Sequence, residues 1–334
     1  MAFRESLLSS WQKTNTLTYA LMPLSWVYQF VFFIRKQLYR VGLFSSYRAA
    51  IPVIVVGNLT VGGTGKTPLV IQLVEQLRAN GYSPAVISRG YSGDAPFYPY
   101  EVMVDSPVSE SGDEPALIVK RTNVPMVVGP NRGASIDLLL ERHSIDVIIS
   151  DDGLQHLALK RDVEVCLIDD TVKSENYFLL PAGPYRERLS RLKTVDLIVH
   201  HQREKADLEN ARYSMTLQAS DAKPLDESKN EPKSLNKEKP IHAVAGIGNP
   251  QRFFDTCRLE GYCFEPHAFP DHHAFEQRDL MFGDAKPVLM TEKDAVKCQQ
   301  IKISDAWYLP VDARLSDGFV DALIAKLTLL KNKE

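Results

Sequence analysis

Residues 52–79 are the part of the chain that most constrains its fold. Pro52–Val56 is short, apolar and rich in β-branched residues, which predicts a buried strand. Gly57–Gly65 is a glycine-rich turn, and Lys66–Ala79 carries apolar residues at helical spacing. A strand, a glycine loop ending in Gly-Lys-Thr and an amphipathic helix predict a phosphate-binding loop. The match is imperfect, because Thr60 stands where the strict pattern G-x-x-x-x-G-K-[ST] has glycine.

This loop has the groups that a nucleotide requires. Glycines allow the backbone N–H groups to approach and surround a β-phosphate. Lys66 would reach the β- and γ-phosphate oxygens, and the Thr67 hydroxyl would complete a Mg²⁺ shell. The alternative is a plain glycine turn followed by a coincidental Lys-Thr pair. We predict a nucleotide site formed by Thr60, Gly62, Gly63, Thr64, Gly65, Lys66 and Thr67.

A second acidic element follows another apolar run. Val147, Ile148 and Ile149 lead into the pair Asp151-Asp152, which resembles a Walker B element. Carboxylates at the end of a buried strand suit a Mg²⁺ site at the edge of a parallel sheet. The alternative is that the two acids only solvate a loop. A guanine-specific site is disfavoured, because the nearest match to its motif, Thr291–Asp294, has Glu292 in place of lysine.

Strand and helix patterns alternate after Arg48 and predict a doubly wound, P-loop NTPase-like α/β sheet with a second, smaller α/β domain. The predicted parts are an N-terminal hydrophobic and basic anchoring segment (1–48), a kinase core (49–218), a polar linker or loop (219–240) and a smaller C-terminal domain (241–334). Strands are expected at Pro52–Val56, Ala85–Ser88, Pro125–Val128, Asp146–Ser150, Val163–Ile168, Val195–Val199, Ile241–Ala245, Cys263–Phe269, Pro287–Met290 and Ala306–Leu309. Two lobes of this kind suit an enzyme that closes over its substrates.

The N-terminal segment is unusual for a cytosolic protein. No residue between Lys13 and Arg35 is charged, and the interval is about as long as a bilayer span. Pro23 and several polar residues interrupt it, and a basic cluster of Arg35, Lys36, Arg40 and Arg48 follows it. Three interpretations stay open: a membrane-anchoring helix, a buried core helix and a partner-docking helix. The basic cluster favours a cytoplasmic position for the rest of the chain.

Bulk composition narrows the possible partners. The formal net charge of −3 gives no electrostatic support for nucleic acid as a partner. Four cysteines are present and none forms a C-x-x-C pair, so their spacing predicts neither a cysteine zinc site nor a disulfide framework. Reduced thiols in the cytosol are the expected state.

Several motifs, taken together and in order, make the chain similar to the tetraacyldisaccharide 4'-kinases, membrane-associated P-loop kinases of lipid A biosynthesis in Gram-negative bacteria. The N-terminal aromatic segment is one of them, and the odd loop with Thr60 is part of the family pattern. The others are "SRGY" (Ser88–Tyr91), "GDEP" (Gly112–Pro115), "GPNR" (Gly129–Arg132), "DDGLQH" (Asp151–His156), "LPAGPYRE" (Leu180–Glu187), "FPDHH" (Phe269–His273) and "TEKDAVK" (Thr291–Lys297).

The resemblance implies transfer of the γ-phosphate of ATP, with Mg²⁺, to the 4'-hydroxyl of a tetraacylated glucosamine disaccharide 1-phosphate at the cytoplasmic face of the inner membrane. It implies catalysis by Asp113, His272 and Lys66, and nucleotide binding that includes Gln155. It further implies metal binding by Thr67, Glu114, Asp151 and Asp152, and substrate binding by Arg89, Tyr91, Arg186 and Glu187. The chemistry is coherent, because phosphoryl transfer requires alignment, charge neutralisation and a carboxylate to accept a late proton.

Two other classes of function remain possible from the residues. One is an ATP-dependent ligase or carboxylase of the dethiobiotin-synthetase type, which acts on a small soluble substrate and does not require an apolar N-terminal segment. The other is a nucleotide-gated membrane adaptor without turnover of its own. Loss of the N-terminal segment would release a lipid kinase from membranes and leave a soluble ligase unaffected.

Overall fold

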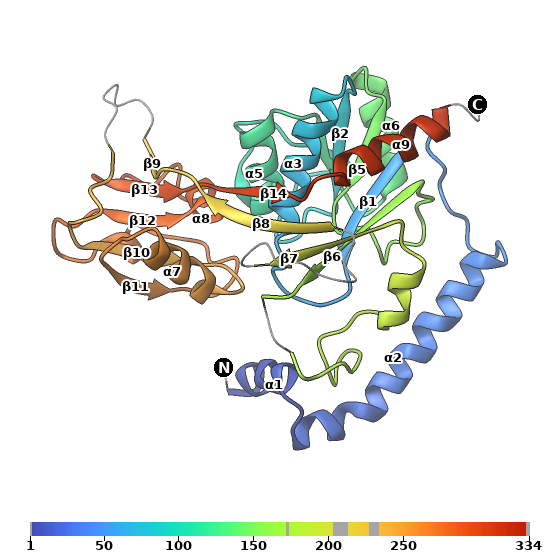
Figure 1. Cartoon of the computed structure of the whole chain (residues 1–334), viewed down its shortest axis with the longest axis horizontal. Coiled ribbons are helices and arrows are strands. Elements are labelled where there is room, and N and C mark those ends of the chain that lie inside the picture. Colours follow the sequence, from blue (N-terminus) through green and yellow to red (C-terminus); the bar gives the residue numbers. More distant parts are fainter. Residues whose placement is uncertain (1, 172–173, 203–212, 227–233, 332–334) are drawn as a thin grey trace.

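The computed structural model describes residues 2–171, 174–202, 213–226 and 234–331, which form two lobes (Figure 1). The larger lobe is built on a nine-stranded sheet in the order β14-β8-β7-β6-β1-β5-β2-β4-β3, and the smaller lobe on a five-stranded sheet in the order β11-β10-β12-β13-β9. The doubly wound α/β fold predicted from the sequence is confirmed.

The larger sheet runs parallel from β8 to β4 in that order, with antiparallel strands β14 and β3 at its two edges. Its strands are β1 (Val53–Asn58), β2 (Pro84–Ser88), β3 (Tyr100–Glu101), β4 (Met126–Val128), β5 (Val147–Ser150), β6 (Val163–Asp169), β7 (Leu197–Gln202), β8 (Tyr213–Ala219) and β14 (Val311–Leu315). The central strand β1 is buried at every position, as the apolar run predicted.

Helices cover both faces of this sheet, and β1 contributes to both cores because successive side chains alternate between faces. Ile54 and Val56 pack with one core, whereas Val53 and Val55 pack with the other. The helices of this lobe are α3 (Lys66–Ala79), α4 (Val108–Ser111), α5 (Asp113–Thr122), α6 (Arg132–Arg142), the short 3₁₀ helix η1 (Leu189–Lys193) and α9 (Phe319–Lys331). The carboxyl ends of β1 and β5 therefore meet at one sheet edge, where a doubly wound fold places its ligands.

The smaller lobe has a mixed sheet with its own two cores. Its elements are β9 (Lys223–Pro224), β10 (Ile241–Ala245), β11 (Phe264–Ala268), β12 (Val288–Thr291), β13 (Ala306–Leu309), α7 (Pro250–Leu259), α8 (Glu292–Lys297) and the 3₁₀ helix η2 (Gln277–Leu280). Strands β10, β11, β12 and β13 run parallel, and β9 pairs antiparallel with β13.

The division between the lobes differs from the predicted boundaries at two places. β14 pairs with β8 in the larger sheet, and Phe319, Leu323 and Leu327 of α9 lie in the larger core, although both elements follow residue 241. Part of the predicted linker also folds, since β9 belongs to the smaller sheet and Leu235 packs in the smaller lobe. Residues 227–233 of that linker lie outside the described residues. The chain thus enters the smaller lobe after β8 and returns through β14.

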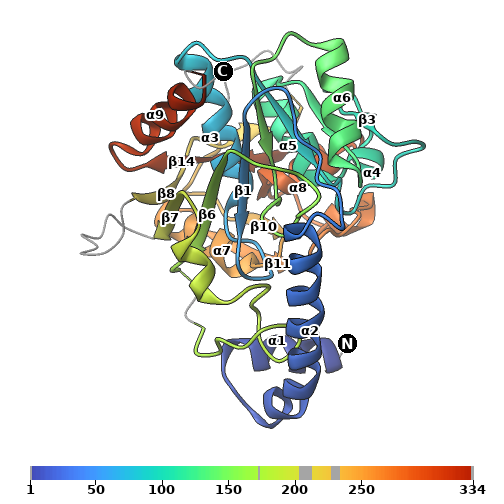
Figure 2. The same cartoon turned by 90° about the vertical axis from the view of Figure 1, so that its right-hand side faces the viewer.

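Two N-terminal helices, α1 (Ala2–Gln12) and α2 (Thr16–Arg40), extend away from the sheet (Figures 1 and 2). Asn15 caps α2 through a reciprocal capping box with Thr18. α2 is long and apolar enough to cross a membrane, and only 11% of its most apolar window is buried. Its exposed side chains include Tyr19, Leu24, Trp26, Val27, Phe30, Val31, Phe33 and Ile34. The alternative of a buried core helix is therefore wrong.

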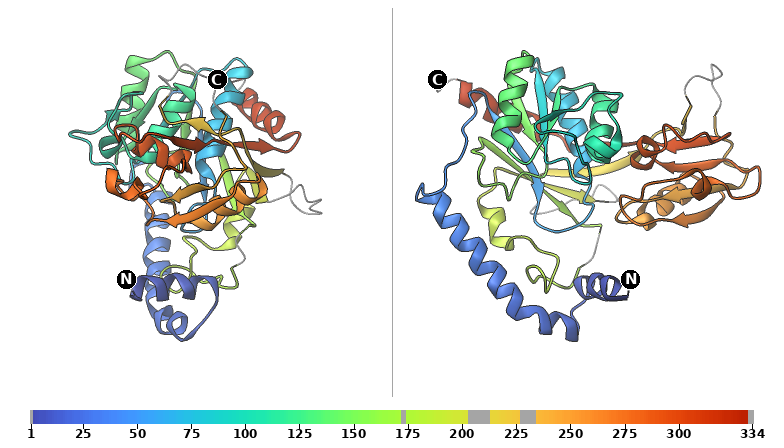
Figure 3. Two further views of the ribbon diagram at one scale, coloured as in Figure 1. Left: turned by 90° about the vertical axis from the view of Figure 1, so that its left-hand side faces the viewer. Right: turned by 180° about the vertical axis from the view of Figure 1, so that it is seen from behind.

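Polar contacts hold the other side of α2 against the segment 174–188. The Ser25 hydroxyl donates to the Leu179 carbonyl at 2.8 Å and accepts from the Ala182 N–H at 3.0 Å. The Tyr28 hydroxyl donates to the Arg186 carbonyl at 2.9 Å. α2 is thereby docked to a segment whose residues 184–186 lie against the glycine loop (Figure 3).

Candidate active site

The glycine loop joins β1 to α3 as predicted, and a buried amide organises it. The Asn58 side chain donates to the Thr64 hydroxyl at 3.2 Å and accepts from Lys66 Nζ at 3.2 Å. Gly65 has a φ of +95° directly before α3, a backbone conformation that glycine adopts without strain. Asn58 thus fixes both Thr64 and the lysine that follows the loop.

A second segment forms a wall beside this loop. The Val61 N–H donates to the Pro184 carbonyl at 2.9 Å, and the Arg186 N–H donates to the Leu59 carbonyl at 2.7 Å. Thr60 forms an isolated antiparallel bridge with Tyr185. The position that breaks the strict glycine pattern therefore lies in extended backbone against the wall, where a β-branched residue is favoured.

Asp152 links the lysine of the loop to the arginine of the wall. Its carboxylate lies 3.5 Å from Lys66 Nζ and 3.0 Å from a terminal nitrogen of Arg186. Burial raises the pKa of Asp152, but the charges of Lys66 and Arg186 outweigh it and hold the pKa below its ordinary value. Asp152 is therefore an ionised, paired carboxylate.

Asp151 has a different environment although it is the next residue. It is 1% exposed at the end of β5, and its Oδ1 atom has no hydrogen-bond partner within the described parts of the chain. Burial, with the neighbouring charges of Glu114 and Asp152, raises the pKa of Asp151 to about 7. The Arg132 guanidinium donates to the Asp151 carbonyl at 2.9 Å rather than to its carboxylate. A buried carboxylate oxygen without a protein partner is a candidate ligand for a water or an ion.

Gln155 connects the loop to the wall as well. Its amide nitrogen donates to the Asn58 carbonyl at 3.3 Å and to Glu187 at 3.0 Å. Glu187 is buried and also lies 3.6 Å from Arg191. In this structure Gln155 therefore hydrogen-bonds both the start of the loop at Asn58 and Glu187 of the wall.

The smaller lobe touches the same loop through Arg252 on α7. One terminal nitrogen of Arg252 donates to the Gly63 carbonyl at 3.4 Å, and the other donates to Asp169 at 2.6 Å. His201, at the end of β7, donates from Nδ1 to the Thr64 carbonyl at 3.0 Å, and burial lowers the pKa of His201. Arg252 and His201 were not predicted, because no sequence spacing connects them to the loop.

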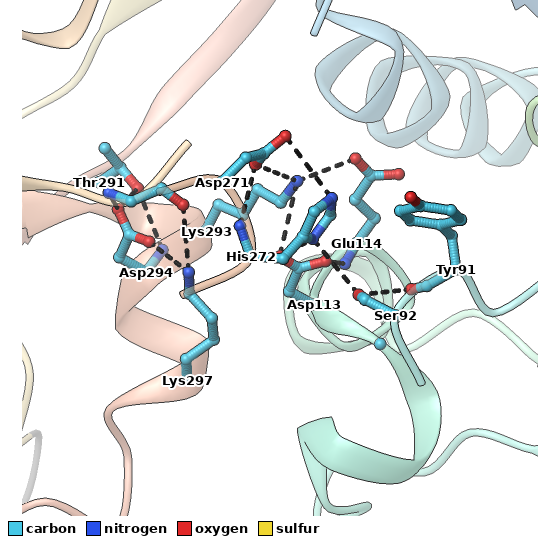
Figure 4. A network of polar contacts seen from close by, with 12 residues as sticks. Tyr91, Ser92, Asp113, Glu114, Asp271, His272, Thr291, Lys293, Asp294 and Lys297 are labelled. Carbon is cyan, nitrogen blue, oxygen red and sulfur yellow. Dashed lines mark hydrogen bonds and ion pairs between the residues drawn. The ribbon is translucent and has the colours of Figure 1, made fainter. Parts of the chain in front are cut away.

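Asp113 and His272 meet across the two lobes (Figure 4). Asp113 begins α5 of the larger lobe and is 2% exposed, and His272 Nδ1 lies 2.9 Å from its Oδ2 atom. Burial raises the pKa of Asp113, but the hydrogen bond from His272 and the charge of Lys293 outweigh it and lower the pKa overall. The same hydrogen bond is the main cause that raises the pKa of His272.

Lys293 extends this contact toward Glu114. Its ammonium lies 3.0 Å from Glu114, 3.6 Å from Asp113 and 3.9 Å from Asp271. These carboxylates raise the pKa of Lys293 despite its burial. Lys293 belongs to the segment that resembled a guanine motif. Asp294 of that segment accepts hydrogen bonds from the Gly246 N–H at 2.8 Å and from the hydroxyl of Thr291, which is the N-cap of α8. The motif Thr291–Lys297 thus contains a site residue, Lys293, whose contacts with Asp113 and Glu114 the sequence did not indicate.

Gly112 determines where Asp113 lies. A Cβ atom at this position would come within 2.5 Å of the Tyr91 carbonyl, and the φ of Gly112 is +88°.

The Tyr91 ring is mostly exposed and lies 5.4 Å from the His272 ring, centroid to centroid. Arg89 is also exposed, and its charge adds to the burial that lowers the pKa of Arg132 to about 10. The predicted substrate residues Arg89 and Tyr91 are therefore exposed, whereas Arg186 and Glu187 lie beside the loop.

A glycine loop at the carboxyl edge of a doubly wound sheet, facing a carboxylate–histidine pair from two lobes, defines a P-loop kinase. The family model described as Tetraacyldisaccharide-1-P 4'-kinase matches residues 17–328 of the chain. The chain belongs to the tetraacyldisaccharide 4'-kinase family, and the recognition and enzyme class predicted from the sequence are confirmed.

Individual relatives agree with this assignment. The chain is 43% identical over 98% of its length to a tetraacyldisaccharide 4'-kinase of Nitrosococcus oceani, covering 96% of that protein. It is 45% identical to the corresponding protein of Hahella chejuensis, with 96% of each chain covered. A crystal structure of LpxK from Aquifex aeolicus in complex with ATP superposes with a TM-score of 0.76 at 26% identity, covering 93% of this chain and 100% of that one.

Proposed function

We propose that this chain binds ATP in the glycine loop and transfers its γ-phosphate to the 4'-hydroxyl of a tetraacylated glucosamine disaccharide 1-phosphate. The observation that carries the proposal is the 2.9 Å contact between Asp113 and His272, which joins the two lobes. A carboxylate held in this way can accept the proton of a sugar hydroxyl when the lobes close.

The lowered pKa of Asp113 fits this role. Phosphoryl transfer passes through a loose transition state, so the hydroxyl proton leaves late and a weak base is sufficient. His272 donates to Oδ2 of Asp113 and so holds the carboxylate in one orientation. Lys293 neutralises part of the negative charge that Asp113, Glu114 and Asp271 would otherwise accumulate.

The oxygen atoms around Asp151 suit Mg²⁺. Carboxylates and hydroxyls are the ligands that Mg²⁺ prefers, and the unpartnered Oδ1 atom of Asp151 is available for one. Thr67, Glu114 and Asp151 would hold the ion. Asp152, already paired with Lys66 and Arg186, would lie next to these ligands without binding the ion directly. When bound, the ion would neutralise phosphate charge.

The remaining roles follow from contacts to the loop. Asn58 keeps Lys66 Nζ at the loop, where its charge favours phosphate oxygens. Arg186 adds a second positive charge on the wall, opposite Asp152. Arg89 and Tyr91 are exposed and the Tyr91 ring lies 5.4 Å from the His272 ring, which supports a role for both in binding the acceptor sugar.

The N-terminal helix supports work at a membrane surface. The acceptor carries acyl chains, and α2 exposes an apolar aromatic face next to the wall segment. Arg35, Lys36 and Arg40 follow at the end of α2, where they suit anionic headgroups. We infer that α2 holds the site at the cytoplasmic face of the inner membrane, where ATP is available.

The deciding experiment uses purified full-length protein, γ-labelled ATP, Mg²⁺ and detergent-dispersed lipid A disaccharide 1-phosphate. We expect label in the lipid from the wild type and almost none from Asp113→Asn or Lys66→Ala variants that remain folded. ATP binding without lipid labelling would contradict the proposal. Transfer to soluble amine or carboxylate acceptors would then indicate a ligase, and no turnover of any acceptor would indicate an adaptor.

A further inference from the structure

Three side chains on the smaller lobe form a cluster that the proposed reaction does not use. His242 on β10 and Glu265 on β11 are register partners, and His267 follows two residues later on β11. Because strand side chains alternate between faces, all three lie on one face of the sheet. One ligand atom from each lies within 4.8 Å of the other two.

The geometry points to a divalent transition-metal site, with Zn²⁺ as the expected ion, formed by His242, Glu265 and His267. Two imidazole nitrogens and one carboxylate are a ligand set that Zn²⁺ uses, with a water in the fourth position. His242 Nδ1 and His267 Nε2 lie 2.9 Å apart, and Glu265 Oε2 lies 3.8 Å from His242 Nδ1. Two nitrogens bound to tetrahedral Zn²⁺ at ~2.0–2.1 Å lie about 3.3 Å apart, so a shift of a few tenths of an ångström suffices.

Asp284 contacts the ring nitrogen of His242 that is not expected to bind the metal. Its Oδ1 atom lies 3.0 Å from His242 Nε2, so this nitrogen carries the ring hydrogen and donates it. The lone pair of His242 is consequently on Nδ1 and faces His267. A carboxylate that accepts from the far nitrogen of a histidine is the usual outer partner of a metal-binding imidazole, and it fixes both the tautomer and the ring orientation.

The surroundings close one side of the cluster and leave another open. The Phe282 ring stacks on both imidazoles, with centroid distances of 4.1 Å to His242 and 4.0 Å to His267. His242 is buried, whereas the Glu265 side chain is 59% exposed and provides access to solvent. Lys286 is the nearby cation, but it pairs with Asp284 at 2.9 Å and lies 3.7 Å from Glu265. Glu265 can therefore turn to a metal at the cost of its longer, exposed pair with Lys286, while the pair of Lys286 with Asp284 stays.

The site has a structural consequence. β11 is the edge strand of the smaller sheet, and the loop that carries His272 follows it directly. A metal bound by His242, Glu265 and His267 would link this edge strand to β10 immediately before that loop. It would stabilise the smaller lobe, and its binding does not depend on the proposed kinase reaction.

The test titrates untagged, EDTA-treated full-length protein with Co²⁺ and then with Zn²⁺, in excess Mg²⁺ so that oxygen-ligand sites are occupied. We expect one equivalent of Co²⁺ with the visible absorption of tetrahedral coordination, displaced by Zn²⁺. Glu265→Gln and His267→Ala should each weaken binding by about tenfold or more. Zn²⁺ should raise the Tm of the wild type and leave that of His267→Ala unchanged.

His143→Ala is the matched control, because His143 also contacts a glutamate, Glu101 at 2.6 Å, in a partly buried position of the larger lobe. It should bind Co²⁺ like the wild type. Glu265→Gln changes an exposed side chain, so it tests the site even if His267→Ala fails to fold. Absence of tetrahedral Co²⁺ in the wild type, or equal affinity in wild type and Glu265→Gln, would overturn the proposal.

Discussion

His272 of the smaller lobe and Asp113 of the larger lobe are joined by a 2.9 Å hydrogen bond. The two residues come from motifs that are far apart in the chain. Each motif contains a left-handed backbone conformation, with φ of +59° at His272 and +88° at Gly112, which precedes Asp113. This contact makes the arrangement of the two lobes part of the site.

Asp113→Asn keeps the shape of the side chain and removes its ability to accept a proton. We expect kcat to fall by about 10²–10⁴-fold. His272→Gln should cost less, because His272 acts by orienting the carboxylate. The double variant should be no worse than Asp113→Asn alone, since the two residues act as a unit. Steady-state transfer of labelled phosphate measures all three, and multiplicative losses would argue for independent roles.

The Asp113–His272 contact should depend on pH through the raised pKa of His272. Its stabilisation is fully present below the ordinary histidine pKa of about 6.5, where His272 is charged in both states, and is lost as pH rises through the raised value. Amide hydrogen exchange in residues 269–273, corrected for intrinsic rate, should therefore increase as pH rises above about 6.5 and through the raised pKa of His272. Asp113→Asn should remove this dependence, and its persistence there would rule out the contact as the cause.

Asn58→Leu removes the buried amide that fixes Thr64 and Lys66. Loss of hydrogen bonds that include a charged partner should weaken ATP binding by about tenfold or more. Titration calorimetry with ATP and Mg²⁺ measures the change. Asn80→Leu is the matched control, because Asn80 is exposed at the other end of α3, and ATP affinity that falls equally in both variants would exclude a local effect.

Arg252→Gln breaks the contact of α7 with Asp169 and with the Gly63 carbonyl. Because the arginine is partly exposed, we expect the substitution to weaken ATP binding by about 1 kcal/mol, which corresponds to a several-fold rise in KM for ATP. Small-angle scattering should detect a larger radius of gyration as the lobes separate. Arg258→Gln on the same helix removes a surface pair with Asp255 and a contact with the Phe264 ring, neither of which involves the loop, and should behave as the wild type. An unchanged KM for Arg252→Gln would indicate that other contacts hold the lobes.

Replacing Trp26, Phe30 and Phe33 by serine removes apolar surface from the exposed face of α2. We expect weaker binding to anionic vesicles and a higher KM for the acylated substrate, because each large side chain contributes roughly 1.5–3 kcal/mol when buried. Flotation with vesicles measures binding. A Leu259→Ser, Met281→Ser variant alters exposed apolar residues on the smaller lobe and serves as the control. Equal loss in both variants would argue against a specific membrane face.

The sequence allowed six of the parallel strands of the larger sheet to be predicted, because they are wholly or mostly buried and therefore appear as apolar runs; these are β1, β2, β4, β5, β6 and β7. β8 and β14 were missed for the opposite reason. β8 is mostly half-buried and β14 mixes polar and apolar residues, so neither stands out from a loop. Without β14 and α9, the end of the chain was assigned to the smaller lobe.

The site residues also divide into those that local spacing predicts and those that depend on the packing of distant segments. The loop, with Lys66 and Thr67, follows from local spacing, because one strand, one turn and one helix determine it. Contacts between Arg252 and Asp169, or between Lys293 and Glu114, depend on how distant segments pack. No local pattern contains that information. The roles assigned by resemblance to Arg89, Tyr91, Gln155 and Glu187 stay predictions.

The pairing of β8 with β14 has a topological consequence. Ala219, where the chain leaves the larger sheet, is the register partner of Val311, where it returns. The smaller lobe is thus an insertion whose two ends lie side by side, as tolerated insertions generally are. Excising it and joining β8 to β14 through a short turn would leave an antiparallel hairpin at the edge of an otherwise unchanged sheet. Such a shortened chain would isolate the nucleotide loop from the residues that close over it.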